Sequence, residues 1–115
     1  MIEWYYSIKK SVEWIEENLP LNSHIIIDES MWTDLYDAGY RFADYYSKVQ
    51  DDPAIRDTIY HDNWQSFDYV VTTPELLSDM REQNLTLVES VVGHSTLVTF
   101  FDTGGWRIEV RQVNK

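Results

Sequence analysis

The stretch of sequence that decides the fold is residues 24–39, which read HIIIDESMWTDLYDAG. Residues 25–27 are three consecutive isoleucines, and strands that are apolar throughout are typical of a sheet covered on both faces. The residues that follow predict a helix over 31–38, because Ser30 is a good N-cap and Gly39 is placed to end the helix. A buried strand followed directly by a helix indicates an α/β unit.

A second unit of the same kind lies further along the chain. Residues 68–74, DYVVTTP, predict another short strand followed by a helix that starts at a Thr-Pro pair. Residues 85–93 predict a further helix, in which Thr86 and Glu89 have the spacing of a capping box. Before the first strand, residues 2–19 predict a helix, since apolar side chains recur there with the helical period.

The C-terminal part of the sequence predicts a β-hairpin. Residues 96–101 and 106–113 form two strand-like runs joined by DTGG, a glycine-bearing link of hairpin length. Residues 106–113 alternate between apolar and charged side chains, which predicts one buried and one exposed face. Residues 40–49 fit a strand or a helix, and a short helix is predicted over 53–59 with Pro53 at its first position.

Together these elements predict an α/β fold. Their order, α-β-α-α-β-α-α-β-β, favours a small three-layer Rossmann-like sheet that is mostly parallel and ends in an antiparallel β-hairpin. The length of 115 residues fits a single domain spanning 1–115.

The composition excludes several classes of function. Nine basic and 20 acidic residues give a net charge of −11, and no basic cluster exists that could displace counterions from nucleic acid. The chain has no cysteine, which excludes disulfides, thiol catalysis and zinc–thiolate sites. We therefore expect no nucleic-acid partner.

Carboxylates follow the first predicted strand, at the position where open α/β sheets usually bind ligands. Asp28 and Glu29 stand directly at this strand end, and Asp34 and Asp37 lie one or two turns into the next helix. Such a cluster could hold Mg²⁺ or Ca²⁺ or act as acid and base. The alternative is that the first two carboxylates cap the helix or complement its dipole. Because the sequence lacks nucleotide-binding and local metal-ligand motifs, we expect no cofactor.

Aromatic side chains offer another candidate surface. Rings beside carboxylates commonly bind neutral sugars, by stacking on their C–H faces while the carboxylates accept hydroxyl hydrogen bonds. The alternative is that rings at helical spacing belong to the core. The side chains concerned are Trp32, Tyr36, Tyr40, Phe42, Tyr45, Tyr46 and Trp64.

Five blocks of sequence, read in order, resemble a known family. They are WIEENLP (14–20), IIDESMWTDL (26–35), KVQDDPAIR (48–56), DYVVTTP (68–74) and FDTGGWRIEVR (101–111). Their order and spacing are similar to the C-terminal soluble domain of bacterial multi-pass membrane glycosyltransferases. These enzymes are related to the protein-mannosyltransferase and aminoarabinose-transferase group, which uses polyprenyl-phosphate-linked sugars. The resemblance covers residues from about 11 to 113.

The resemblance implies an accessory role. In that family the transfer chemistry belongs to acidic residues in an extracytoplasmic loop of the membrane module, so no catalytic residue carries over to this chain. The implied location is the outer face of the cytoplasmic membrane, as a domain excised from a longer multi-pass membrane protein, with residues 2–19 as the connecting helix. The implied partners are the membrane module itself and a glycan or polyprenyl-phosphate sugar. The matching positions are Asp28, Trp32, Asp34, Asp52, Pro53 and Arg56.

Three hypotheses of function follow. The first is a non-catalytic extracytoplasmic domain that positions acceptor or lipid-linked sugar or stabilises the membrane module. The second is a stand-alone acidic domain with a carboxylate or metal site at Asp28 and Glu29. The third is a protein-interaction module that uses its exposed aromatics and its negative field. We expect ligand contacts at Asp28, Glu29, Trp32, Asp34 and Arg56.

Overall fold

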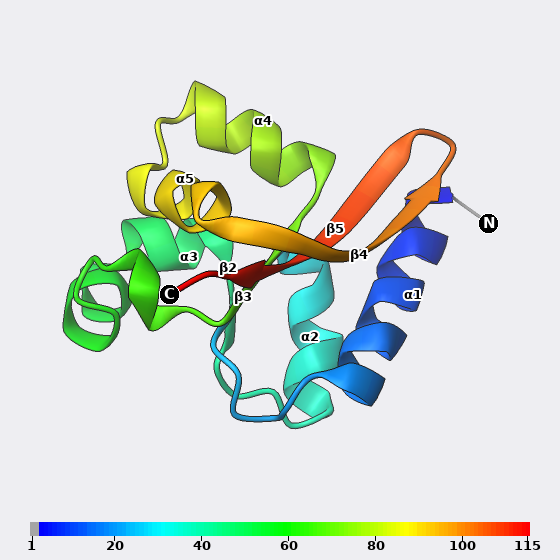
Figure 1. The fold of residues 1–115 in the computed structure, drawn as a ribbon, viewed down its shortest axis with the longest axis horizontal. Helices are drawn as coiled ribbons and strands as arrows, with labels where there is room; N and C mark the ends of the chain where they lie inside the picture. Colours follow the sequence, from blue (N-terminus) through cyan, green and yellow to red (C-terminus); the bar gives the residue numbers. More distant parts are fainter. Residues whose placement is uncertain (1–2) are drawn as a thin grey trace.

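One mixed sheet organises the chain in the computed structural model, which describes residues 3–115 and their side chains from Tyr5 onward. Within these residues five strands follow the order β2-β1-β3-β5-β4 (Figure 1). β1 pairs in parallel with β2 and β3, whereas β5 pairs antiparallel with β3 and β4. The strands are β1 (Ile25–Ile27), β2 (Ala43–Tyr45), β3 (Tyr69–Thr72), β4 (Ser95–Thr103) and β5 (Trp106–Val113).

The predicted α/β fold and its antiparallel C-terminal hairpin are confirmed. The sheet is mixed, since two of its four pairings in residues 3–115 are parallel and two are antiparallel. The tight turn after β4 sends β5 back between β4 and β3, so β5 runs against both neighbours. The parallel part is therefore limited to β2, β1 and β3.

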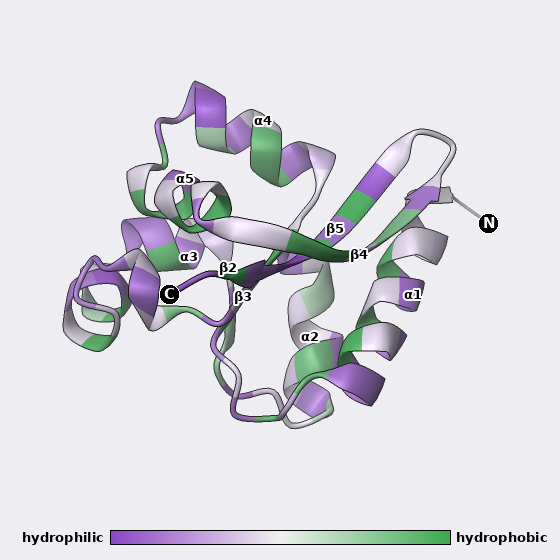
Figure 2. Cartoon of the chain, viewed as in Figure 1, coloured by the Kyte–Doolittle hydropathy of each residue, from purple (hydrophilic) through white to green (hydrophobic). Residues whose placement is uncertain are grey.

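Helices cover both faces of the sheet (Figure 1). Figure 2 shows hydrophilic and hydrophobic residues alternating along α1 and α4. On one face lie α1 (Glu3–Asn18) and α2 (Glu29–Asp37); on the other lie α3 (Tyr46–Asp51), α4 (Pro74–Glu82) and α5 (Thr86–Gly93), with the π-helical turn η1 (Ala54–Ile59) and the 3₁₀ turn η2 (Trp64–Ser66).

The three isoleucines of β1 explain why the sheet needs both layers. Ile25 and Ile27 point into the core beneath α1 and α2, and Ile26 points into the core beneath α3 to α5. All three are fully buried. Alternating side chains of a strand face opposite sides of a sheet, so an entirely apolar strand is stable only when both sides are covered.

Two predicted helix caps are wrong. α2 begins at Glu29, and its N-cap is Asp28 instead of Ser30, because the Asp28 carboxylate accepts the Ser30 amide. α5 has Leu85 as its N-cap residue, and no capping box forms between Thr86 and Glu89. The start of α4 is confirmed: Thr73 caps it by accepting the Leu76 amide, and a proline occupies the first turn.

The stretch 40–49 contains both a strand and a helix. Residues 43–45 form β2 beside β1, and the chain enters α3 at Tyr46 without a loop. Gly39 has φ of +104°, a conformation that glycine adopts without strain, and it ends α2 before this stretch. Within residues 3–115, no helix has both the length and the apolar character required to cross a bilayer.

Candidate functional site

The carboxyl ends of β1 and β3 meet at the centre of the parallel part of the sheet. The strand order β2-β1-β3 means that the chain leaves β1 through α2 on one face and leaves β3 through α4 on the other. Ligands of open α/β sheets usually lie at such a point. Asp28 follows β1 and Thr73 follows β3, so both stand in this crevice.

Hydrogen bonds already occupy the Asp28 carboxylate. Its Oδ1 accepts from the Ser30 amide at 3.0 Å and from the Ser30 hydroxyl at 2.7 Å. Its Oδ2 accepts from the Thr73 hydroxyl at 2.9 Å, and Thr73 in turn caps α4. Asp28 is only 5% exposed. The negative charge that helix N-termini attract is therefore supplied at this point by the protein's own carboxylate.

The space beside this carboxylate is small and acidic. A hollow of about 180 Å³ is lined by Ile8, Asp28, Ser30, Glu75 and Trp106. Two carboxylates in its wall disfavour an anionic ligand such as a phosphate. Among the described residues, no group of three or more His, Asp or Glu side chains is placed to hold a metal ion.

The other predicted site residues fall into two places. Glu29, Trp32 and Asp34 lie on α2 close to Asp28; Glu29 and Asp34 are exposed, and Trp32 stacks on Tyr36 with ring centroids 5.0 Å apart. Arg56 lies on η1, which packs on the opposite face of the sheet. The structure thus places four of the five predicted residues on α2 and its N-cap and separates the fifth.

Arg56 has local partners in its own loop. Its guanidinium binds both oxygens of the Asp57 carboxylate, at 2.8 and 2.9 Å, and donates to the Gln50 carbonyl at 2.9 Å. These contacts tie η1 to the end of α3.

The aromatic residues do not form one surface. Tyr40 is buried and its hydroxyl donates to the carbonyls of Ile15 and Leu19, and Tyr46 donates to Asp79. Phe42 is exposed on one side but stacks on the His24 ring at 4.6 Å. The remaining rings are Trp32 and Tyr36, which stack on each other, Tyr45, which packs against the core, and Trp64, which stacks on His94.

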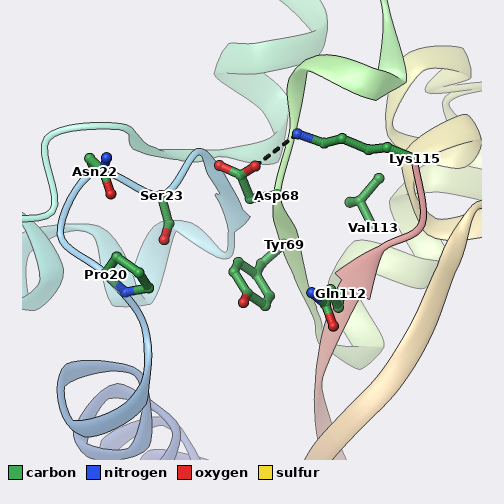
Figure 3. A pocket seen from close by; sticks show the side chains of 8 residues that line it. All are labelled: Pro20, Asn22, Ser23, Asp68, Tyr69, Gln112, Val113 and Lys115. Carbon is green, nitrogen blue, oxygen red and sulfur yellow. Dashed lines mark hydrogen bonds and ion pairs between the residues drawn. The ribbon is translucent and has the colours of Figure 1, made fainter.

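A larger hollow lies at the opposite end of the parallel strands (Figure 3). Its volume is about 470 Å³, and we call it the Tyr69 hollow. Its walls come from the loop after α1, the start of β3 and the end of β5. The lining residues are Pro20, Asn22, Ser23, Asp68, Tyr69, Gln112, Val113 and Lys115.

Asp68 forms the charged wall of the Tyr69 hollow. Its Oδ2 accepts from the His24 amide at 2.9 Å, and its Oδ1 accepts from the Lys115 ammonium at 2.8 Å. Burial opposes ionisation of Asp68, but the hydrogen bonds from Lys115 and His24 outweigh it and lower the pKa of this carboxyl below its ordinary value. At neutral pH the hollow therefore contains a neutralised ion pair.

The sequence does not reveal the Tyr69 hollow. Its polar residues come from three segments separated by more than 40 positions, and none belongs to a motif with a known spacing. The one local signal is Asp68 at the first position of a predicted strand. Comparison of the chain with protein-family models, with curated proteins and with solved structures finds no match.

Proposed function

We propose that this chain is a non-catalytic extracytoplasmic accessory domain of a membrane glycosyltransferase, with a three-layer Rossmann-like architecture. It positions acceptor or lipid-linked sugar for the membrane module, or stabilises that module. The observation that carries this proposal is the resemblance of the five sequence blocks.

The role of the shared residues in the fold supports a non-catalytic domain. Asp28 caps α2, Asp52 accepts the Ala54 amide at 2.9 Å at the start of η1, and Arg56 ties η1 to α3. Gly104 and Gly105 form the turn of the β4–β5 hairpin with positive φ angles. These residues build helix starts and turns. A resemblance carried by such residues indicates a shared fold and does not indicate a shared active site.

The start of α1 indicates which end of the domain would face the membrane module. The Ser7 hydroxyl, in the early part of α1, donates to the Thr103 hydroxyl at 2.7 Å, so α1 begins beside the tip of the β4–β5 hairpin (Figure 1). If α1 connects to a preceding membrane segment, this tip and the Asp28 crevice face the module. The net charge of −11 favours contact with the module over contact with anionic lipid.

Fractionation and transfer assays test this proposal. The longer membrane protein that we expect to contain this domain, called the native chain below, should sediment with membranes and be digested by protease added outside the cytoplasmic membrane. Deletion of residues 20–115 from it should reduce transfer from a polyprenyl-phosphate sugar, and the 115-residue chain alone should transfer none. Recovery of the native chain in the cytosol, or glycosyl transfer by the 115-residue chain alone, would overturn the proposal.

The edge strand favours a second candidate, a protein-interaction module. β4 is at the edge of the sheet and contains no Lys, Arg or Pro, the residues that commonly protect such edges. Leu97, Val98 and Phe100 are 41%, 44% and 49% exposed on it. Membranes that carry the module without this domain can be mixed with the 115-residue chain to measure how much of the chain they retain. If β4 pairs with the membrane module, Val98→Lys should weaken this retention. Gln83→Lys, an equal charge change on an exposed residue, should not; equal retention of both variants would exclude β4 as the contact.

A further inference from the structure

We infer that the Tyr69 hollow is a binding site for one neutral sugar residue. Four polar side chains in its lining are without hydrogen-bond partners among residues 3–115. They are the Ser23 and Tyr69 hydroxyls and the Asn22 and Gln112 amides.

Ser23 is the most informative of the four. Its residue is 5% exposed, yet its hydroxyl bonds to no described group, and only its amide is paired, with the Pro20 carbonyl at 3.1 Å. Figure 3 shows this hydroxyl directed toward the space between Pro20 and Tyr69. No side-chain polar atom of the described residues is both fully buried and unpaired, so this hydroxyl is open to the hollow and free to bond to a molecule that enters it.

The charge of the hollow favours a neutral ligand. Asp68 and Lys115 neutralise each other at 2.8 Å, so the walls offer no free cation to an anionic group. The net charge of −11 also repels anions from the whole surface. Hydroxyl and amide side chains, which both donate and accept, match the hydroxyl groups of a sugar.

The shape of the hollow supplies apolar contact as well. The aromatic ring of Tyr69 lines it, and sugars place their C–H faces on aromatic rings; Pro20 adds apolar surface beside it. Its volume of about 470 Å³ is within the range of roughly 300–1,000 Å³ that is usual for small-molecule sites.

The hollow follows from the end of a helix. α1 ends at Asn18, and Pro20 turns the chain toward β1, so the sheet beyond this point is left uncovered. Tyr69 pairs with Gln112 across β3 and β5, which places both side chains on the same face of the sheet, where Tyr69 also packs against the core beneath α1 and α2. The hollow therefore lies where the chain after α1, the start of β3 and the end of β5 meet.

The position of the hollow indicates which sugar it would take, and this step rests on the proposed function. α1 has 16 residues and is about 24 Å long at 1.5 Å per residue. This length separates the hollow from the hairpin tip where the membrane module would lie. The site then holds the acceptor glycan and not the lipid-linked donor.

Amide NMR of the 115-residue chain tests sugar binding directly. Titration with methyl glycosides of glucose, mannose and N-acetylglucosamine should give saturable shifts at Ser23, Tyr69 and Gln112, with a Kd on the order of millimolar for at least one of them. Glucuronate should bind more weakly than methyl glucoside because it is charged. Absence of saturable shifts with all three glycosides, shifts located elsewhere, or equal shifts with glycerol would overturn the inference.

Variants locate the site. Gln112→Ala changes an exposed side chain, and Ser23→Ala removes one hydroxyl; each should weaken binding by about fivefold to tenfold. Tyr69→Phe keeps the aromatic ring and should therefore weaken sugar binding less than Tyr69→Ala does. Tyr36→Ala, an exposed ring on α2, is the matched control and should leave the Kd unchanged. Unchanged binding in Ser23→Ala and Gln112→Ala together would also overturn the inference.

The two proposals fail independently. If no sugar binds but deletion of the domain still reduces transfer by the native chain, the accessory function stands without this site. If a sugar binds but the native chain is cytosolic, the site stands and its assignment to an acceptor is withdrawn.

Discussion

The carboxylate of Asp28 accepts hydrogen bonds from both sides of the central crevice, from Ser30 on α2 and from Thr73 at the start of α4. These two helices cover opposite faces of the sheet. One side chain thus caps α2 directly and positions the cap of α4. Helix-capping side chains and buried charge-assisted hydrogen bonds each stabilise a fold measurably.

Removal of the Asp28 carboxylate should therefore destabilise the protein. We expect Asp28→Ala to lower the free energy of unfolding by about 1–3 kcal/mol, because one cap is lost and the Thr73 hydroxyl loses its acceptor. Urea unfolding measures the change. Glu29→Ala, the neighbouring exposed carboxylate, is the control and should cost less than about 1 kcal/mol. Equal stability of the two variants would show that Asp28 does not carry this capping role.

Glu109 predicts a pH dependence of stability. Burial opposes its ionisation, but hydrogen bonds at 2.7 Å from Arg107 and from Arg111 outweigh it and lower its pKa below the ordinary value of about 4.5. The unfolded state therefore binds the proton at higher pH than the folded state does. The stabilisation is complete above that ordinary value and is lost as the pH falls through the folded pKa.

We expect the stability difference between the wild type and Glu109→Gln to shrink as the pH falls below about 4. Urea unfolding at a series of pH values measures this difference. Glu82→Gln changes an exposed carboxylate that has no ion pair among the described residues, and it should show no such trend. A difference that grows toward acid pH would contradict the expected sign.

At the scale of elements, α5 is capped by a residue far away in the sequence. Its own N-cap residue, Leu85, has no side chain that can accept a hydrogen bond. The buried Gln50 of α3 accepts instead, through Oε1, from the Leu87 amide at 2.9 Å and the Val88 amide at 3.2 Å. This contact joins two helices on the same face of the sheet.

Gln50→Ala should leave two buried amides without an acceptor. We expect a loss of about 1–3 kcal/mol in unfolding free energy and faster hydrogen exchange at Leu87 and Val88. Hydrogen exchange read by NMR separates this local effect from a general one. Gln65→Ala, on an exposed residue, is the control. If Leu87 and Val88 keep their protection in Gln50→Ala, the side chain is not the cap.

Across the whole molecule, charge repulsion opposes the folded state. Twenty acidic and nine basic residues give −11, and excess charge of one sign destabilises a compact chain. Salt screens this repulsion over a Debye length of about 10 Å at 0.1 M. Most of the ion pairs in residues 3–115 are at least partly exposed, and exposed pairs contribute little.

The unfolding midpoint should therefore rise as NaCl increases from about 10 mM to about 0.5 M. Thermal unfolding at several salt concentrations measures this. The double variant Glu17→Gln and Glu82→Gln changes the net charge from −11 to −9, by −11 + 2, and should show a smaller rise. A midpoint that falls with salt would indicate that specific ion pairs outweigh the repulsion.

Sequence reasoning succeeded where the signal was local. The β1 isoleucines, the Thr73 cap and the glycines of the hairpin turn each have a conformational preference that neighbouring residues reinforce. It failed for the helix cap at Ser30, because Asp28 and Ser30 are both good caps and the contacts of Asp28 with Ser30 and Thr73 select Asp28. It also failed at Thr86, because α5 is capped by the distant Gln50. It also left β2 open, since Ala43-Asp44-Tyr45 has no strand pattern of its own.

The sequence alone is sufficient to predict the α/β class, the position of most helices and the C-terminal hairpin, because these features depend on short-range periodicity and turn chemistry. Contacts between distant segments establish the rest: β2 exists because it pairs with β1, Gln50 caps α5 across 37 positions, and the Tyr69 hollow joins segments more than 40 positions apart. Such contacts depend on how the sheet is ordered and where α1 ends, and neither is encoded in any one stretch of the chain.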